Sequence, residues 1–197
     1  MKTSIILIII YLSQPSFIFA QASQQPFVFT VFGGLFFPSY QQFDEIYESH
    51  SDLIWGGGVA LPLEALTFVI GDIAFFRAEG FFDRDKDSTA RLEEKFIHTG
   101  ILNKQLIGRL WFLRLSGGLN YVTVKQETSS PQAATQTVEA EKKIGYFAGI
   151  GIERLLEDGR LSFFGDLVYD YRRSHTKELF GDFGGVRIVF GAHVYLF

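Results

Sequence analysis

Alternating hydrophobic and polar residues recur in short stretches along the chain, and turn-forming residues separate these stretches. This period of two is typical of β-strands that bury one face. No hydrophobic run after residue 22 approaches the roughly 20 residues that a membrane-spanning helix needs. The pattern predicts eight strands, over residues 27–37, 53–61, 66–82, 92–102, 109–125, 139–155, 160–173 and 185–197.

The connections between these strands alternate in length. The long ones are polar and cover 38–52, 83–91, 126–138 and 174–184, and the short ones cover 62–65, 103–108 and 156–159. The last short connection contains Asp158-Gly159, a strong hairpin signal because Gly tolerates positive φ. Outer-membrane barrels have this layout, with long loops outside the cell and short turns in the periplasm. We therefore predict an all-β fold, an eight-stranded antiparallel up-and-down transmembrane β-barrel.

The two faces of the predicted strands differ in size as well as in polarity. In segment 109–125, bulky residues such as Trp111 and Leu119 alternate with Arg114 and Asn120, and segments 139–155 and 160–173 show the same alternation. Eight strands enclose a lumen just wide enough for side chains, so the smaller, more polar face belongs inside. The bulky face would then contact lipid, with aromatic residues near the strand ends at the membrane interfaces. These residues are Trp111, Tyr121, Tyr146, Tyr169 and Tyr171.

The first 22 residues have the features of a cleaved secretion signal. Lys2 is followed by the apolar segment 5–12, and Ala20-Gln21-Ala22 has the small-x-small pattern of a cleavage site. We expect cleavage after Ala20 or Ala22 and a mature barrel over 23–197. This places the protein in the bacterial outer membrane, after secretion across the inner membrane.

Composition narrows the classes of function. The net charge is −4, and removal of Lys2 with the signal makes it −5, which argues against a nucleic-acid partner. The chain has no Cys, which excludes disulfides and Cys-based metal or redox sites. Aromatic residues make up 16% of the chain, and Gly occurs 20 times, as expected for closely packed strands with one apolar face.

The second half of the chain resembles the small outer-membrane β-barrel domains of the OmpA-like, OmpX-like and opacity-protein type. The resemblance is carried by residues 116–121, 145–153 and 182–197, which include a Gly-rich strand ending in Gly-x-Glu and an alternating last strand. It implies that Tyr195 and Phe197 form a signal read by the barrel-assembly machinery. The family pattern turns these two residues outward, with Arg187 and His193. The oilier residues of this strand have the opposite parity, and a bulge near Gly191 would reconcile the two.

Charged residues on the inward-facing positions form a candidate interior network. Because an isolated buried charge is very costly, we expect these side chains to pair. A paired network is either a polar plug that holds the barrel rigid or a gated path for protons or ions, and we favour the plug. The residues are Arg114, Glu153, Asp166, Asp170, Arg172 and Arg187.

The sequence gives only weak signals of catalytic or metal-binding sites. Ser49-His50-Ser51-Asp52 holds the three residue types of a hydrolytic triad, but neighbours in an extended loop point in alternating directions. Residues 83–87 alternate carboxylates as a Ca²⁺ loop does, yet Ser88 stands where an EF-hand has its invariant Gly. The Gly-rich runs lack the context of a nucleotide-binding loop. We expect no catalytic residues, no metal and no cofactor.

The favoured function is therefore a non-enzymatic, monomeric surface barrel with a structural or interaction role. Outer-membrane lipid and the assembly machinery are its expected partners, and loops 38–52 and 126–138 would contact an extracellular ligand, the latter loop being polar and mobile. The alternatives are a narrow transporter of small hydrophobic molecules through a lateral opening, a lipid-modifying enzyme and a soluble lipocalin-like binder. An apolar lumen pocket would favour the transporter, and a Ser/His/acid cluster at the external rim would favour the enzyme.

Deletion of Phe197 tests the sorting role. We expect less folded barrel in the outer membrane, because the assembly machinery would no longer recognise the last strand. The measurement is the amount of heat-modifiable protein on a gel of outer membranes, and an unchanged amount would remove the sorting role.

Overall fold

The computed structural model describes residues 26–39, 43, 47, 51–81, 88–130, 133–139, 143–175, 180–182 and 184–197. The predicted signal segment 1–22 lies outside these residues. Within the described part of the chain, no helix is long and apolar enough to cross a membrane. The strands are β1 (Phe27–Pro38), β2 (Asp52–Glu64), β3 (Thr67–Phe81), β4 (Thr89–Gly108), β5 (Trp111–Ser130), β6 (Ala133–Glu139), β7 (Lys143–Leu155), β8 (Leu161–Tyr171), β9 (Arg173–His175), β10 (Phe180–Asp182) and β11 (Gly185–Leu196).

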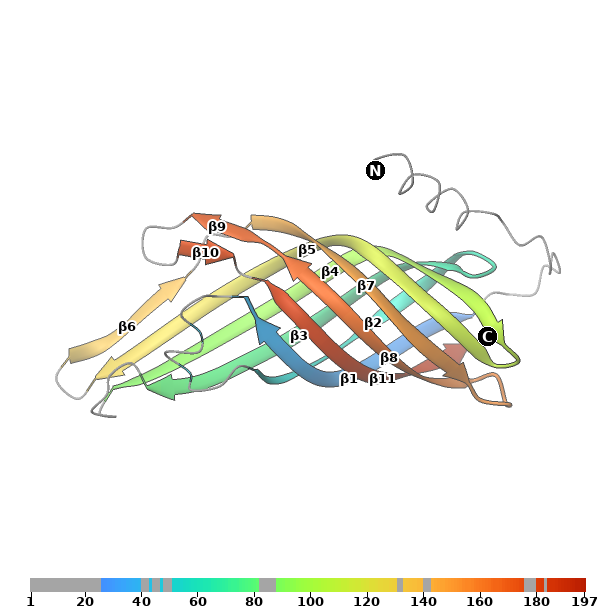
Figure 1. Ribbon diagram of the computed structural model, residues 1–197, viewed down its shortest axis with the longest axis horizontal. Coiled ribbons are helices and arrows are strands. Elements are labelled where there is room, and N and C mark those ends of the chain that lie inside the picture. The colour runs from blue at the N-terminus through green and yellow to red at the C-terminus, as the bar shows by residue number, and fades with distance from the viewer. Residues whose placement is uncertain are drawn as a thin grey trace, which may run out of the picture.

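The strands form a closed antiparallel ring in the order β1-β2-β3-β4-β5-β7-β8-β11 (Figure 1). Closure occurs between β1 and β11, where Phe27 pairs with Leu196 and Pro38 with Gly185. Each strand of the ring therefore has two hydrogen-bonded neighbours. The predicted eight-stranded antiparallel barrel is confirmed.

The two ends of the barrel differ as the connection lengths predict. The short turns, the start of β1 and the end of β11 lie at one end, and the long connections lie at the other (Figure 1). The turn between β7 and β8 contains Gly159 at φ +70°, a left-handed conformation that favours glycine. We call these the turn end and the loop end.

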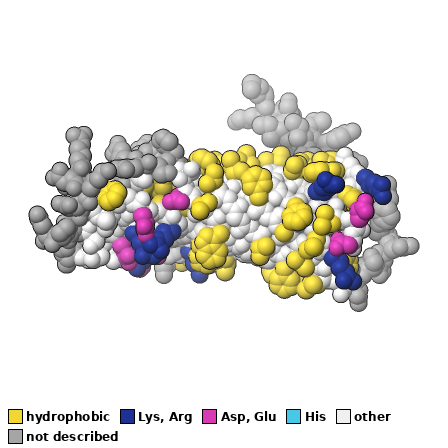
Figure 2. All heavy atoms as spheres, turned by 90° about the horizontal axis from the view of Figure 1, so that it is seen from below, with side chains coloured by type: hydrophobic (Ala, Val, Ile, Leu, Met, Phe, Trp, Pro, Cys, Tyr) yellow, Lys and Arg dark blue, Asp and Glu magenta, His cyan; other side chains and the backbone are white. Residues whose placement is uncertain are grey.

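The outward face of the barrel is a band of exposed apolar side chains, with charged groups toward both ends (Figure 2). On β7, Tyr146, Ile150 and Ile152 point outward and are about half exposed, whereas Phe147 and Glu153 are buried. On β5, the outward residues of the apolar band run from Trp111 to Tyr121. This stretch has the length of 9–11 residues that a tilted strand needs to cross a bilayer. The predicted orientation of β5, β7 and β8 is confirmed.

Glycine on the inward face permits close packing where β4 meets β5. Gly100 pairs directly with Gly118. A Cβ on Gly118 would lie 2.2 Å from the backbone oxygen of Thr99. Any side chain here would clash with the neighbouring strand, which explains glycine at both positions.

Strands β4 and β5 are longer than the sequence pattern predicts. Each has 20 residues, and β6 extends the sheet by pairing with the outer part of β5. The prediction of a mobile loop over 126–138 is wrong, because β5 and β6 form a hairpin there. The outward residues in this region are charged, so the apolar alternation ends although the strands continue.

In β11 the more apolar set of alternating residues faces outward. Ile188 and Phe190 face outward, while Arg187, His193 and Tyr195 face the interior. The register of β11 against β1 and β8 is unbroken, so the bulge expected near Gly191 is absent. The family-based expectation that Tyr195 turns outward is wrong.

Substitution of Ile150 with Arg tests the lipid-facing assignment. Ile150 pairs with Leu115 and Leu167 in the middle of the apolar band. A charge there should lower the free energy of unfolding in lipid vesicles by about 2–4 kcal/mol. The matched control is Thr89→Arg at the outer end of β4, which should change it by less than about 0.5 kcal/mol. Equal effects of the two substitutions would contradict the assignment.

Candidate functional site

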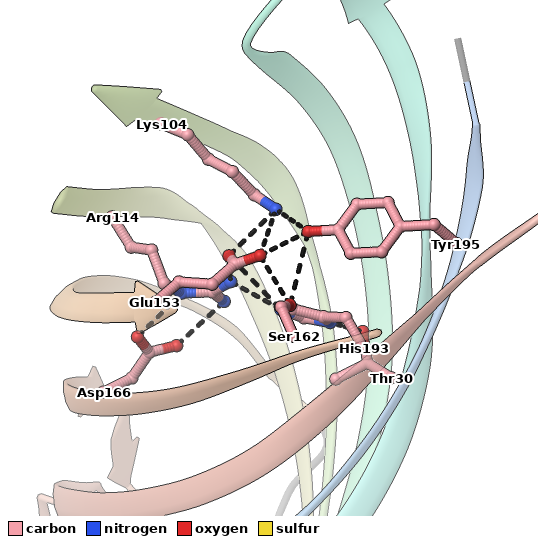
Figure 3. Close-up of polar contacts among 8 residues, drawn as sticks. All are labelled: Thr30, Lys104, Arg114, Glu153, Ser162, Asp166, His193 and Tyr195. Atoms are coloured by element: carbon pink, nitrogen blue, oxygen red, sulfur yellow. Dashed lines mark hydrogen bonds and ion pairs between the residues drawn. The ribbon is translucent and has the colours of Figure 1, made fainter. Parts of the chain in front are cut away.

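Glu153 is the centre of a polar cluster inside the turn end of the barrel (Figure 3). Lys104 Nζ lies 3.0 Å from Glu153 Oε1, and Arg114 NH1 lies 2.7 Å from Oε2. Ser162 Oγ donates to Oε1 at 2.7 Å, and the Tyr195 hydroxyl donates to the same oxygen. One buried carboxylate thus joins β4, β5, β8 and β11 to its own strand, β7.

Arg114 extends this cluster across the lumen. Its guanidinium makes a two-pronged ion pair with Asp166, with distances of 2.9 and 3.0 Å. Arg114 NH1 also lies 2.5 Å from His193 Nε2. Arginine only donates, so Nε2 must accept, and the ring proton is on Nδ1, which donates to Thr30 Oγ1 at 2.8 Å. His193 is therefore neutral.

A second polar cluster lies deeper in the barrel, toward the loop end, and His98 is at its centre. His98 Nδ1 is 2.7 Å from Asp72 and Nε2 is 2.8 Å from Asp170. Both nitrogens thus face carboxylates, and Arg187 NH2 also lies 3.3 Å from Nε2. Asp170 is held further by Arg187 at 2.7 Å and by the Asn120 amide at 3.2 Å.

The predicted network is present in two parts. Arg114, Glu153 and Asp166 meet in the first cluster, and Asp170 and Arg187 meet in the second. The barrel also buries Arg172 completely, as its predicted interior position requires.

The sequence pattern does not identify the inward-facing partners of these residues. Lys104 lies beyond the predicted strand 92–102, whereas β4 continues to Gly108 and gives Lys104 the same inward orientation as His98. The orientation of His193 and Tyr195 was left open. The further members of the two clusters are Thr30, Asp72, His98, Lys104, Asn120, Ser162, His193 and Tyr195.

A small cavity of about 70 Å³ separates the two clusters. Its lining includes Asp72, Asp166 and Arg187 along with apolar side chains. Such a volume holds a few water molecules at most. It does not fit the ligand-sized apolar pocket that a transporter of hydrophobic molecules needs.

Apolar side chains fill most of the loop half of the lumen, where Glu94 and Arg172 are also buried. The ring of Phe36 packs against those of Phe76 and Phe96 at centroid distances of 4.9 and 5.2 Å. The expectation of small residues inside the barrel is therefore wrong for this half, where large aromatic rings face inward.

Two residues of loop 38–52 complete this apolar core. Phe43 and Tyr47 are buried, their rings stack at 4.7 Å, and Phe43 also contacts Phe76. These two side chains pack into the barrel and are not available to an external ligand. Most of the loop, including His50, lies outside the described residues.

The described histidines are not arranged for nucleophilic catalysis. His193 faces the Thr30 hydroxyl with the nitrogen that carries its proton, so it cannot act as a base toward that hydroxyl. His98 has both nitrogens bonded to carboxylates. Within the described ranges, no three His, Asp or Glu side chains are placed to hold a metal ion. The carboxylates at 83–87 lie outside those ranges.

Beyond the apolar band, the outward face of β3, β4, β5 and β6 carries alternating charges, and we call this region the charged wall. Along β3, β4 and β5, opposite charges stand two residues apart, and opposite charges also face each other across neighbouring strands, including Lys125 and Glu139 of β6. Arg77 lowers the pKa of Glu79 by a hydrogen bond, and Glu127 raises the pKa of Lys125 in the same way at 2.5 Å. The charged residues are Arg77, Glu79, Arg91, Glu93, Lys125, Glu127 and Glu139.

Exposed ion pairs of this kind contribute little to stability, because water screens them. The charged wall therefore contributes little to the stability of the barrel.

No family model matches the sequence, and no curated protein matches it. Solved structures do match the fold. Neisserial surface protein A aligns with a TM-score of 0.58 and 9% identity, over 86% of this chain and 96% of that one. The chain has the fold of the small outer-membrane β-barrels.

Two further structures agree with this result. A major outer-membrane protein of Thermus thermophilus aligns with a TM-score of 0.56 and 14% identity, over 86% of this chain and 99% of that one. The attachment invasion locus protein Ail of Yersinia pestis, in complex with the heparin analogue sucrose octasulfate, aligns with a TM-score of 0.55 and 14% identity, over 87% of this chain and 97% of that one.

Replacement of Glu153 with Gln tests the role of the first cluster. Loss of this charge leaves Lys104 and Arg114 without a shared buried partner, which should lower the free energy of unfolding in lipid vesicles by about 3–5 kcal/mol. The control is Glu157→Gln in the exposed turn, with an expected change below about 0.5 kcal/mol. An unfolding free energy of Glu153→Gln equal to that of the wild type would show that the cluster does not stabilise the barrel.

Proposed function

We propose that this protein is a non-enzymatic outer-membrane barrel that presents the charged wall as an interaction surface outside the cell. The main support is that the wall is a regular sheet continuing beyond the apolar band, on the side of the barrel formed by β3, β4 and β5 (Figure 1). A rigid sheet outside the membrane orders its side chains before binding, which lowers the entropy cost of association.

The charge pattern of the wall favours a protein partner over a polyanion. Each cation of the wall has a glutamate beside it, so a sulfated polysaccharide would meet more repulsive than attractive groups among the charged residues of the wall. Ail was solved with a heparin analogue. For this chain, we propose a partner surface with both signs of charge, such as an extracellular protein.

The filled lumen supports a structural role for the interior. Salt bridges occupy the turn half, aromatic rings fill the loop half, and the cavity between them is small. We therefore expect no sustained ion conductance in planar bilayers. Single-channel currents that persist at low voltage would overturn the interior-plug assignment and favour a gated path.

Removal of the β5–β6 hairpin tests the proposed surface. Gln126 pairs with Val138, so an Asn-Gly turn can replace 127–137 without affecting the pairing of β5 with β7. We would compare cells displaying each form for binding to immobilised extracellular-matrix proteins and to heparin. We expect the native form to bind at least one protein, and the hairpin deletion to reduce this binding about tenfold or more.

The control is a variant with Glu157 and Asp158 replaced by Asn and Ser in the turn between β7 and β8, at the opposite end of the barrel. It should bind as the native form does, and heat-modifiability should show equal amounts of folded barrel for all forms. Binding unaffected by the deletion, binding to heparin alone, or no binding above cells without the protein would contradict the proposal.

A further inference from the structure

The outward face of β7, β8 and β11 contains a groove within the apolar band. Gly165 faces outward on β8, and its neighbours across the sheet are Ile152 on β7 and Phe190 on β11. Gly165 has no side chain, and the Phe190 ring lies 3.1 Å from the place where its Cβ would stand. Beside this ring, a hollow of about 640 Å³, open on its outer side, remains between the surrounding side chains. It is far larger than the cavity in the lumen, and it opens toward lipid.

The lining of the groove is apolar along most of its length. Phe163 and Leu167 border Gly165 on the same strand, and both are about half exposed. Hydrocarbon is the only medium in contact with this part of a membrane barrel, so the groove is filled by lipid chains. Its shape offers one chain more contact area than the convex surface around it.

A cation lies at the turn end of the groove. Arg154 is in the rung of the sheet that also contains Trp111 and Phe163, and its guanidinium lies 5.4 Å from the centroid of the Trp111 ring. No carboxylate of the described residues forms an ion pair with Arg154. An interfacial arginine beside a tryptophan is well suited to bind a phosphate group.

We propose that this groove is a binding site for one glycerophospholipid, with an acyl chain beside Gly165 and the Phe190 ring and the phosphate on Arg154. The inference rests on the proposed membrane location. The turn end faces the periplasm in that orientation, so the ligand comes from the inner, phospholipid leaflet. The apolar hollow and the unpaired cation thus match the two parts of one molecule.

The chain contains its own probe for this site. It has two tryptophans, and Trp111 lines the groove whereas Trp55 lies toward the loop end beside Phe75. In a Trp55→Phe background, the fluorescence of Trp111 reports contact with phospholipids brominated on the acyl chain. We would compare quenching by brominated phosphatidylglycerol and phosphatidylcholine in vesicles of defined composition.

We expect the anionic lipid to be preferred about fivefold near Trp111. Arg154→Gln should remove this preference, and Gly165→Leu should reduce quenching by both lipids because it fills the groove. Phe190 is 67% exposed, so its ring has room to move away from the larger side chain. Native mass spectrometry of the detergent-extracted barrel should show one retained phospholipid, lost in Gly165→Leu.

The matched control is Trp111→Phe, in which the remaining Trp55 should be insensitive to Arg154→Gln. Equal quenching by the two lipids, or selectivity that survives both substitutions, would overturn the lipid site. Heat-modifiability is measured first. A chain that does not insert into vesicles at all contradicts the membrane location, whereas an inserted barrel without lipid preference contradicts the groove alone.

Discussion

Closure of the hydrogen-bonded ring is the constraint on which the rest of this structure depends. In hydrocarbon, an unpaired backbone group costs several kcal/mol, so a membrane sheet has to end where it began. The pairing of β1 with β11 satisfies this condition. Once the ring is closed, alternate residues face either lipid or a narrow lumen, and each strand must supply both kinds of side chain.

The two halves of the lumen are filled by different kinds of side chain. Toward the turn end, charged groups form short ion pairs around Glu153, with His98 and Asp170 deeper inside. Toward the loop end, aromatic rings such as Phe36 and Phe96 fill most of the space, and Glu94 and Arg172 are buried among them. Each side chain of the first kind requires its partner, whereas the second kind requires only volume, so the two halves differ in their tolerance to substitution.

The sequence alone predicts the closed ring of eight strands, but not how far the strands extend at the loop end. Period-two alternation identified the eight strands and the outward faces of β5, β7 and β8, because lipid imposes that pattern directly. It failed at Arg91 and Glu127, where the outward face meets water and charge replaces apolar residues although the strands continue. It identified Arg114 and Glu153 as interior charges, yet missed Lys104 and could not orient His193, because partners from other strands determine these positions.

The seam between β1 and β11 also has a consequence for assembly. Across it, Thr30 on one strand bonds to His193 on the other, and Tyr195 reaches Glu153 on β7, two strands away from β11 in the ring. A slip of β11 by one residue would turn both side chains toward lipid and leave Glu153 short of a donor. The polar cluster around Glu153 therefore favours the native register of β11 against β1, because only that register satisfies all of its buried polar groups.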